Sequence, residues 1–187
     1  GQCTGWDRAG YHIDGCIHWL TGTKDGTELN GLWRDVGALS DDVKIIQLED
    51  FGKVELGGTT ITIWKDLDRF ERELIAIGPE DAKHVKALMR TIRAAQSMPM
   101  PARVAPELLS PGALIALMFE MVRKGSIMRK YSSVTASQYA ARYHNPVLRQ
   151  FFGTRVTPGY SFYIFPFSLA VFSSSNGAIP EGGSREM

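Results

Sequence analysis

The stretch Lys53-Val54-Glu55-Leu56-Gly57-Gly58-Thr59-Thr60-Ile61-Thr62-Ile63-Trp64 decides the first element of the fold. Polar and apolar residues alternate strictly from Thr60 to Ile63, which is typical of a strand with one buried face. The pair Gly57-Gly58 can adopt the positive φ angles that a two-residue turn requires. We therefore predict a β-hairpin whose strands run from Lys53 to Leu56 and from Thr59 to Trp64.

Apolar residues recur at helical spacing after the hairpin. Asp66 or Asp68 can cap a helix whose apolar face carries Phe70, Leu74 and Ile77. Gly78-Pro79 then ends this helix and starts another. The apolar face of the second helix contains Val85, Leu88, Met89 and Ile92. Its cations, which we expect to form a solvated surface rather than a binding site, are Lys83, Lys86, Arg90 and Arg93.

Upstream of the hairpin the signals are shorter. Thr27 or Asn30 can cap a helix that Gly37 ends, and residues 43–48 predict a buried strand. The segment from Gly10 to Trp19 is a short apolar run. It is interrupted by His12, Asp14 and His18. Taken alone, this segment predicts an edge strand with a turn at Asp14-Gly15.

The C-terminal half is mainly helical. Four prolines between Ser97 and Gly112 predict a linker, and helices are predicted over residues 113–124, 135–143, 146–152 and 162–172. The segments 113–124 and 162–172 are apolar on more than one face, so they are either fully buried or line a cavity for an apolar ligand. We predict an α+β fold, in which a mixed sheet carries the hairpin and a mostly helical cap extends from Glu80 to Ser175.

Composition excludes several classes of protein. The chain has 187 residues, 44% of them hydrophobic and 22% charged, as in an ordinary globular protein. Its net charge of +1 gives no electrostatic reason to bind nucleic acid. The two cysteines, Cys3 and Cys16, form no disulfide framework, so we expect a reduced, intracellular setting. Their spacing relative to His12 and His18 is not that of paired zinc ligands, and no metal site is predicted.

Familiar catalytic motifs are absent from the sequence. It contains no Gly-x-Ser-x-Gly elbow, no Walker loop and no Gly-x-Gly-x-x-Gly fingerprint. The chain alone is therefore not expected to hold a dinucleotide in the standard way. It begins at Gly1 in the middle of a motif, and Ser184 has the character of an N-cap before a helix that is not included. From these ends we expect a piece of a longer protein.

Seven short segments carry a resemblance to a known family: residues 1–6 (GQCTGW), 10–15 (GYHIDG), 17–19 (IHW), 31–37 (GLWRDVG), 66–70 (DLDRF), 133–149 and 179–184 (IPEGGS). In this order and spacing the sequence resembles FAD-dependent oxidoreductases of the phytoene dehydrogenase type. That group includes carotenoid desaturases and isomerases and retinol saturase-like proteins. The resemblance covers nearly the whole chain. Each motif is short, but their order and spacing together are fairly specific.

The resemblance implies a set of cofactor-binding residues. In the family the glycine turn at the start lies along the ADP portion of FAD, which implies that Gly1 and Gln2 contact it. The family often has arginine where Gln2 stands, so the cation near the pyrophosphate is in doubt. The Gly-Tyr-x-x-Asp-Gly motif leads towards the isoalloxazine ring, which implies the same role for Asp14, Gly15, His18 and Trp19. His18 is the candidate catalytic residue, because an imidazole can both donate and accept a proton.

The resemblance also implies a division of the chain and a function. Residues 1–79 form a flavin-adjacent segment with the hairpin sheet, 80–175 a helical cap and substrate region, and 176–187 a return segment towards an FAD domain outside this chain. That domain would hold most of the FAD. The implied activity is oxidation or reduction of an apolar, unsaturated small molecule, without nucleic acid as a partner. A non-catalytic cap or binding module and a small apolar-ligand-binding protein remain alternatives. We expect a cytoplasmic protein and leave peripheral contact with a membrane open.

Overall fold

The computed structural model describes residues 4–98, 100, 102 and 104–185. The chain divides into two compact units. Unit 1 comprises residues 1–48, 100–109 and 174–187, and unit 2 comprises residues 49–99 and 110–173. Helices and small antiparallel sheets are combined in the chain, so the predicted α+β class is confirmed.

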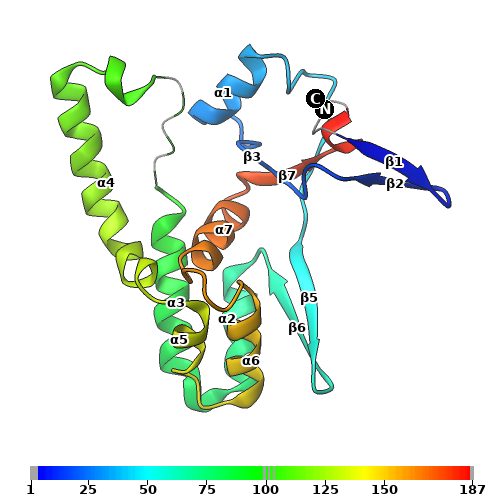
Figure 1. Ribbon diagram of the computed structural model, residues 1–187, viewed down its shortest axis with the longest axis vertical. Helices are drawn as coiled ribbons and strands as arrows, with labels where there is room; N and C mark the ends of the chain where they lie inside the picture. The colour runs from blue at the N-terminus through cyan, green and yellow to red at the C-terminus, as the bar shows by residue number, and fades with distance from the viewer. Residues whose placement is uncertain (1–3, 99, 101, 103, 186–187) are drawn as a thin grey trace. The chain divides into compact units, whose positions relative to one another are not determined.

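Unit 1 is built around a short strand near the C-terminus (Figure 1). Strand β7 (Gly177–Pro180) lies between β3 (Leu20–Thr21) and β4 (Ile45–Ile46) and pairs antiparallel with both. A separate hairpin is formed by β1 (Gly5–Arg8) and β2 (Tyr11–Asp14). Helix α1 (Glu28–Asp35) and the single-turn helices η2 (Pro106–Leu108) and η3 (Gly183–Arg185) complete the unit. The return segment is therefore central to the fold of unit 1.

Two expectations for the strands need correction. The buried strand predicted over residues 43–48 is only the two-residue β4, and Ile46 within it is 39% exposed. The predicted mixed sheet is replaced, in the described residues, by three small sheets with antiparallel pairing. β4 is this short because it pairs with only two residues of β7, Ile179 and Pro180, and that partner lies more than a hundred residues away in the sequence.

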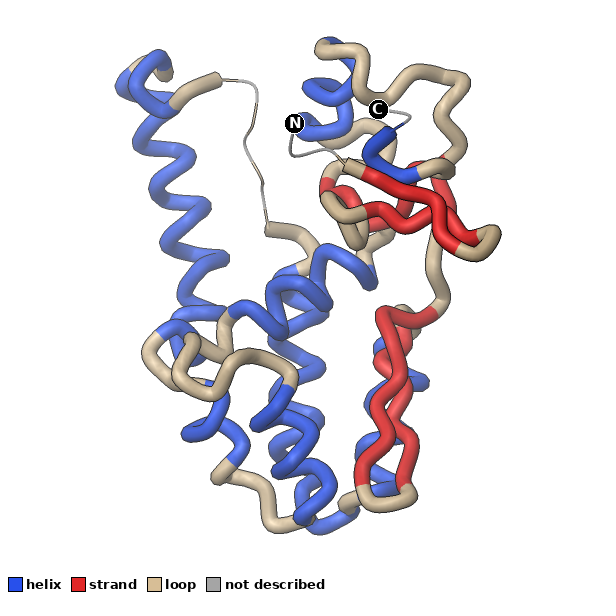
Figure 2. The backbone as a smooth tube through the Cα atoms, turned by 45° about the vertical axis from the view of Figure 1, so that its right-hand side comes forward, coloured by secondary structure: helices blue, strands red, loops and turns tan. Residues whose placement is uncertain are grey.

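Unit 2 contains the predicted hairpin, formed by β5 (Asp50–Leu56) and β6 (Thr59–Trp64) and drawn as a pair of red strands beside the helices in Figure 2. Gly57 and Gly58 have φ angles of 56° and 81°, as the two-residue turn requires. The division predicted at residue 79 placed this hairpin with the N-terminal segment. The compact units group it with the helices instead.

The helices of unit 2 are α2 (Leu67–Ile77), α3 (Ala82–Ala95), α4 (Pro111–Ser132), α5 (Ala136–Ala140), α6 (Pro146–Thr154) and α7 (Ile164–Ser173), and the single turn η1 (Pro79–Asp81) precedes α3. Asp66, rather than Asp68, caps α2, since its carboxylate accepts the backbone N–H groups of Asp68 and Arg69. The predicted apolar residues of α3 are all fully buried.

Aromatic rings fill the interior of unit 2. The rings of Tyr139 and Phe162 stack with centroids 3.7 Å apart, and those of Tyr143 and Phe152 with centroids 4.5 Å apart. Phe165 packs on both Phe162 and Phe152. Since these rings contact one another directly, the segment 162–172 belongs to a close-packed core, which is the first of the two alternatives that its sequence left open.

Helix α4 departs from expectation. Its N-terminal half was predicted to be buried or to line a cavity, but several of its apolar side chains are exposed to solvent, while Leu114 and Leu117 are half-buried. The most exposed of them are Ile115 (68%), Met118 (59%), Phe119 (68%) and Val122 (69%). No helix in the described part of the chain combines the length and apolar character needed to cross a bilayer.

Candidate functional site

The predicted site is organised by the carboxylate of Asp14, the last residue of β2. One of its oxygens, Oδ1, accepts the backbone N–H groups of Cys16 at 2.7 Å and Ile17 at 3.1 Å. Such a bond from an aspartate to the backbone two residues ahead fixes a tight turn. The amide of Gly15 donates to the Thr4 carbonyl at 2.8 Å, which ties the same turn to the start of β1. The turn predicted at Asp14-Gly15 is confirmed.

The second partner of Asp14 comes from the other end of the chain. The backbone N–H of Ser184 donates to Asp14 Oδ2 at 2.5 Å, and the Ser184 hydroxyl donates to Oδ1 at 3.1 Å. Ser184 is buried, and the preceding Gly183 has a φ of 70°. A Cβ atom on Gly183 would lie on the Asp14 carboxylate. Only glycine therefore permits this approach, which joins residues 170 positions apart in the sequence.

These bonds lower the pKa of Asp14 to about 2. The largest contribution is the amide of Ser184, followed by that of Cys16, and partial burial opposes them. Hydrogen bonds donated to a carboxylate favour its charged form. Asp14 is thus an anion at neutral pH whose acceptor sites are already used within the chain. It can order the loop after β2, but it is not suited to deliver a proton.

Gly15 is also constrained from within the chain. A Cβ atom at this position would lie 2.7 Å from the Trp6 ring and 3.1 Å from the Thr4 carbonyl oxygen. Trp6 can therefore pack on the turn only because Gly15 has no side chain. Beyond Gly15 the loop is open, because Cys16 and His18 are exposed and Ile17 is half-buried.

Trp19 and His18 have different surroundings. The half-buried ring of Trp19 lies close to the backbone of β7, where a Cβ on Gly177 would be 2.2 Å from two ring carbons. Trp19 thus packs against the return segment, whereas His18 extends from the same loop into solvent. The first two predicted residues, Gly1 and Gln2, lie outside the described residues, as does Cys3.

The structure brings together four of the six predicted site residues, Asp14, Gly15, His18 and Trp19, on one loop. The sequence did not identify Gly177, Gly183 or Ser184 as their partners. The signal that could have found them is the run Gly182-Gly183-Ser184, since paired glycines followed by a serine offer unobstructed backbone N–H groups to an anion. Ser184 was predicted to cap a helix. It instead lies within η3, and the residues that would continue a helix are not described.

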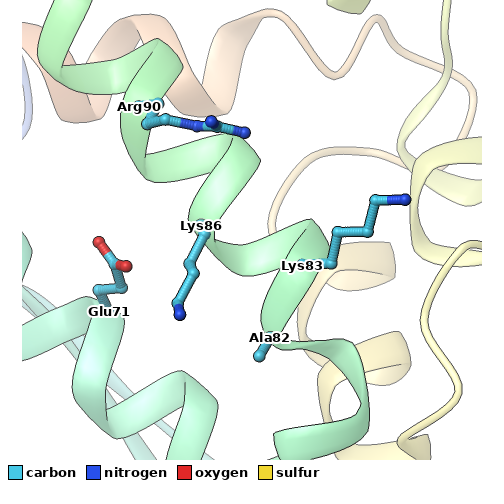
Figure 3. Close-up of a pocket in the computed structure, with 5 residues that line it drawn as sticks. All are labelled: Glu71, Ala82, Lys83, Lys86 and Arg90. Atoms are coloured by element: carbon cyan, nitrogen blue, oxygen red, sulfur yellow. The ribbon is translucent and has the colours of Figure 1, made fainter.

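Other clusters were compared with this site. A shallow depression of about 470 Å³ on α3 is lined by Glu71, Ala82, Lys83, Lys86 and Arg90. Its cations extend in different directions and do not converge on one point (Figure 3). Glu71 is bound at 2.8 Å by Arg93. This face is consistent with the solvated surface that the sequence predicts. Across the described residues, no three His, Cys, Asp or Glu side chains are grouped to hold a metal ion.

Comparison with known proteins adds no further constraint. Neither the available family models nor the curated proteins contain a match to this sequence. The function must therefore be inferred from the loop at Asp14, from its partners in the return segment and from the motifs that the two segments carry.

Proposed function

We propose that the chain is part of an FAD-dependent oxidoreductase of the phytoene dehydrogenase type that acts on an apolar, unsaturated substrate. The observation that supports this most directly is the pair of hydrogen bonds between Asp14 and Ser184. Asp14 belongs to the GYHIDG motif, and Ser184 ends the IPEGGS motif. The two motifs come from opposite ends of the resemblance and meet at one carboxylate, as expected of segments that serve a common site.

The residues present fit a flavin on the open side of this loop. The backbone from Gly15 to Ile17 is held in a fixed turn, and Cys16 and His18 are accessible. Asp14, whose oxygens are occupied, would act as a positioning residue, and Trp19 would set the position of the loop on β7. Bound FAD would supply the hydride chemistry, while the protein supplies orientation and hydrogen bonds. His18, which is exposed on the same loop, would hold or release a proton beside the substrate.

Flavin content tests the proposal. A longer protein that carries a dinucleotide-binding βαβ unit before Gly1 should purify yellow, with the absorbance of bound flavin. Residues 1–187 alone should not quench flavin fluorescence at stoichiometric concentration, because the helix N-terminus that would hold the pyrophosphate is missing. A colourless longer protein that gains no absorbance when incubated with FAD would contradict the proposal.

His18→Ala is the most informative substitution in the loop. Because His18 is exposed, its removal should leave folding and flavin content unchanged while turnover falls by about two orders of magnitude, as for loss of a general acid or base. His84→Ala is a control for the loss of an imidazole outside the loop, since that half-buried ring packs against Tyr143 in unit 2. Gly15→Val is less suitable, because an added side chain would collide with Trp6 and disturb the loop directly. Unchanged turnover in His18→Ala would assign this residue no catalytic role.

The alternative of a non-catalytic module that binds apolar molecules is favoured by one observation, the exposed apolar side chains of α4. The same flavin measurement separates the two proposals. We propose the cytoplasm as the compartment, consistent with two cysteines that form no disulfide framework.

A further inference from the structure

Helix α3 carries only one sign of charge. Its 14 residues include four Lys and Arg residues and no acidic residue. Lys83, Lys86 and Arg90 are exposed and follow the spacing i, i+3, i+7, which places them along one side of the helix. A helix face that is only solvated commonly mixes both signs, because opposite charges three or four positions apart stabilise the helix. The exposed side of α3 departs from that pattern.

These three cations have no counter-ion within the described part of the chain. The fourth cation of the helix, Arg93, does have partners and holds Glu71 at 2.8 Å. Glu71 is the carboxylate that lines the depression beside the three cations, so its charge is already paired. Asp81, which precedes α3, is fully buried and accepts backbone N–H groups at the start of α6. Neighbouring acids therefore leave the three cations uncompensated.

The placement of the cations opposes the stability of α3. Like charges three or four positions apart repel each other, as Lys83 and Lys86 or Lys86 and Arg90 do. Lys83 also lies in the first turn, where the positive end of the helix dipole disfavours a cation. An arrangement that works against local stability is expected where a surface has a function.

The cations are arranged for an extended anion. Figure 3 shows them leaving α3 in different directions around a shallow depression of about 470 Å³, in which Ala82 is the apolar lining residue. A single phosphate or carboxylate is held best by donors that converge on it, so a compact anion does not fit. From Lys83 to Arg90 the helix rises by about 10 Å. That span suits several carboxylates carried on one acidic segment.

We propose that this face of α3, defined by Lys83, Lys86 and Arg90, is a docking surface for an acidic segment of another protein. Carboxylates of the segment pair with the three cations and replace the water that solvates them in the free chain. Unit 2 has fifteen Lys and Arg residues against ten Asp and Glu, whereas unit 1 has six against ten. The charge of unit 2 therefore steers an acidic partner to this unit. The short span and the net charge of +1 do not favour nucleic acid.

Fluorescence anisotropy of a labelled peptide of ten glutamates, titrated with the 187-residue chain, tests the proposal. We expect binding at low salt that is lost at high salt, because salt screens exposed charges. A peptide of ten glutamines should not bind. Lys83→Gln combined with Lys86→Gln and Arg90→Gln should weaken binding about tenfold or more. The melting temperature of this variant should stay the same or rise, because repulsion within α3 is removed.

A matched control separates this face from the overall charge. Lys53→Gln combined with Arg129→Gln and Lys130→Gln removes the same charge from exposed positions elsewhere in unit 2 and should change the affinity by less than about twofold. Absence of binding at low salt, or equal loss of affinity in the two triple variants, would overturn the proposal. So would equal affinity for an oligothymidylate of matched charge, which would indicate a general polyanion surface. A lower melting temperature of the α3 variant would assign its cations a structural role instead. None of these measurements depends on a flavin.

Discussion

At the scale of single residues, the candidate site depends on a carboxylate that serves as an anchor. Asp14 accepts hydrogen bonds from its own loop and from Ser184, and both sets stabilise its charged form. Its position before a glycine allowed the turn to be predicted from sequence. Its contact with Ser184 could not be predicted, because no local pattern encodes a partner 170 residues away.

Asp14→Asn tests the anchor. The amide that replaces one carboxylate oxygen presents hydrogen atoms, so it cannot satisfy both the Ser184 N–H and the turn at once. We expect unfolding to become easier by on the order of 1–2 kcal/mol at neutral pH, a figure discounted for the partial exposure of Asp14. Denaturant titration measures this loss. Asp42→Asn, at an exposed position, is the control and should have little effect.

The same anchor sets a pH dependence. The pKa of Asp14 falls from 3.8 to about 2 on folding, so its stabilising contribution is complete above pH 3.8. It is lost as the pH falls from 3.8 through 2. Asp14→Asn should therefore flatten the stability profile only in this acid range. If wild type and variant lost stability in parallel there, the hydrogen bonds to Asp14 would not be the cause.

At the scale of elements, the sequence predicted those whose pattern is local. The hairpin, α2, α3 and the cap of α1 follow from alternation, helical spacing and capping residues. The start of α6 also depends on a long-range contact that the sequence does not reveal. The fully buried carboxylate of Asp81 accepts the N–H groups of His144 and Asn145, 63 and 64 residues away. Burial acts to raise the pKa of Asp81, but these hydrogen bonds outweigh it and the net shift is downward.

The same reasoning explains the errors. The strand expected over residues 43–48 is short because its pairing is determined by β7 and not by its own apolar run. For α4 we expected either burial or the lining of a cavity, because periodicity alone cannot distinguish an apolar surface that faces a core from one that is exposed. In the hairpin, by contrast, the alternation of polar and apolar residues was sufficient to predict the strands. The helix that packs on β6 is α2, which follows the hairpin directly in the chain.

The hairpin turn provides the test at this scale. Gly57 has a φ of 56° and open space around its missing Cβ, so a side chain would meet no steric clash with neighbours. Gly57→Val should still lower stability by about 1–2 kcal/mol, because a β-branched residue resists positive φ. Gly159→Val, at a site that is also open but without positive φ, isolates the backbone effect. Equal melting temperatures for the two variants would contradict this explanation.

At the scale of the whole molecule, the two units differ in the amount of core they contain. The buried apolar side chains described in unit 1 are Leu20, Leu39, Ala178 and Pro180, and two of its strands have only two residues. Unit 2 contains the buried face of α3 and the aromatic interior. Because burial of apolar area provides most of the free energy of folding, local opening should require less free energy in unit 1.

Hydrogen exchange measured by mass spectrometry tests this difference. In the 187-residue chain, backbone amides of β7 should exchange faster than those of α3 between Val85 and Ile92, although both segments are hydrogen-bonded. In the longer flavoprotein that we propose, added contacts and FAD would stabilise unit 1 by mass action, so protection should rise in β7 and change little in α3. Slow exchange of β7 already in the isolated chain, at the rate of α3, would show that unit 1 needs no further support and would remove this reason to place a flavin domain beside it.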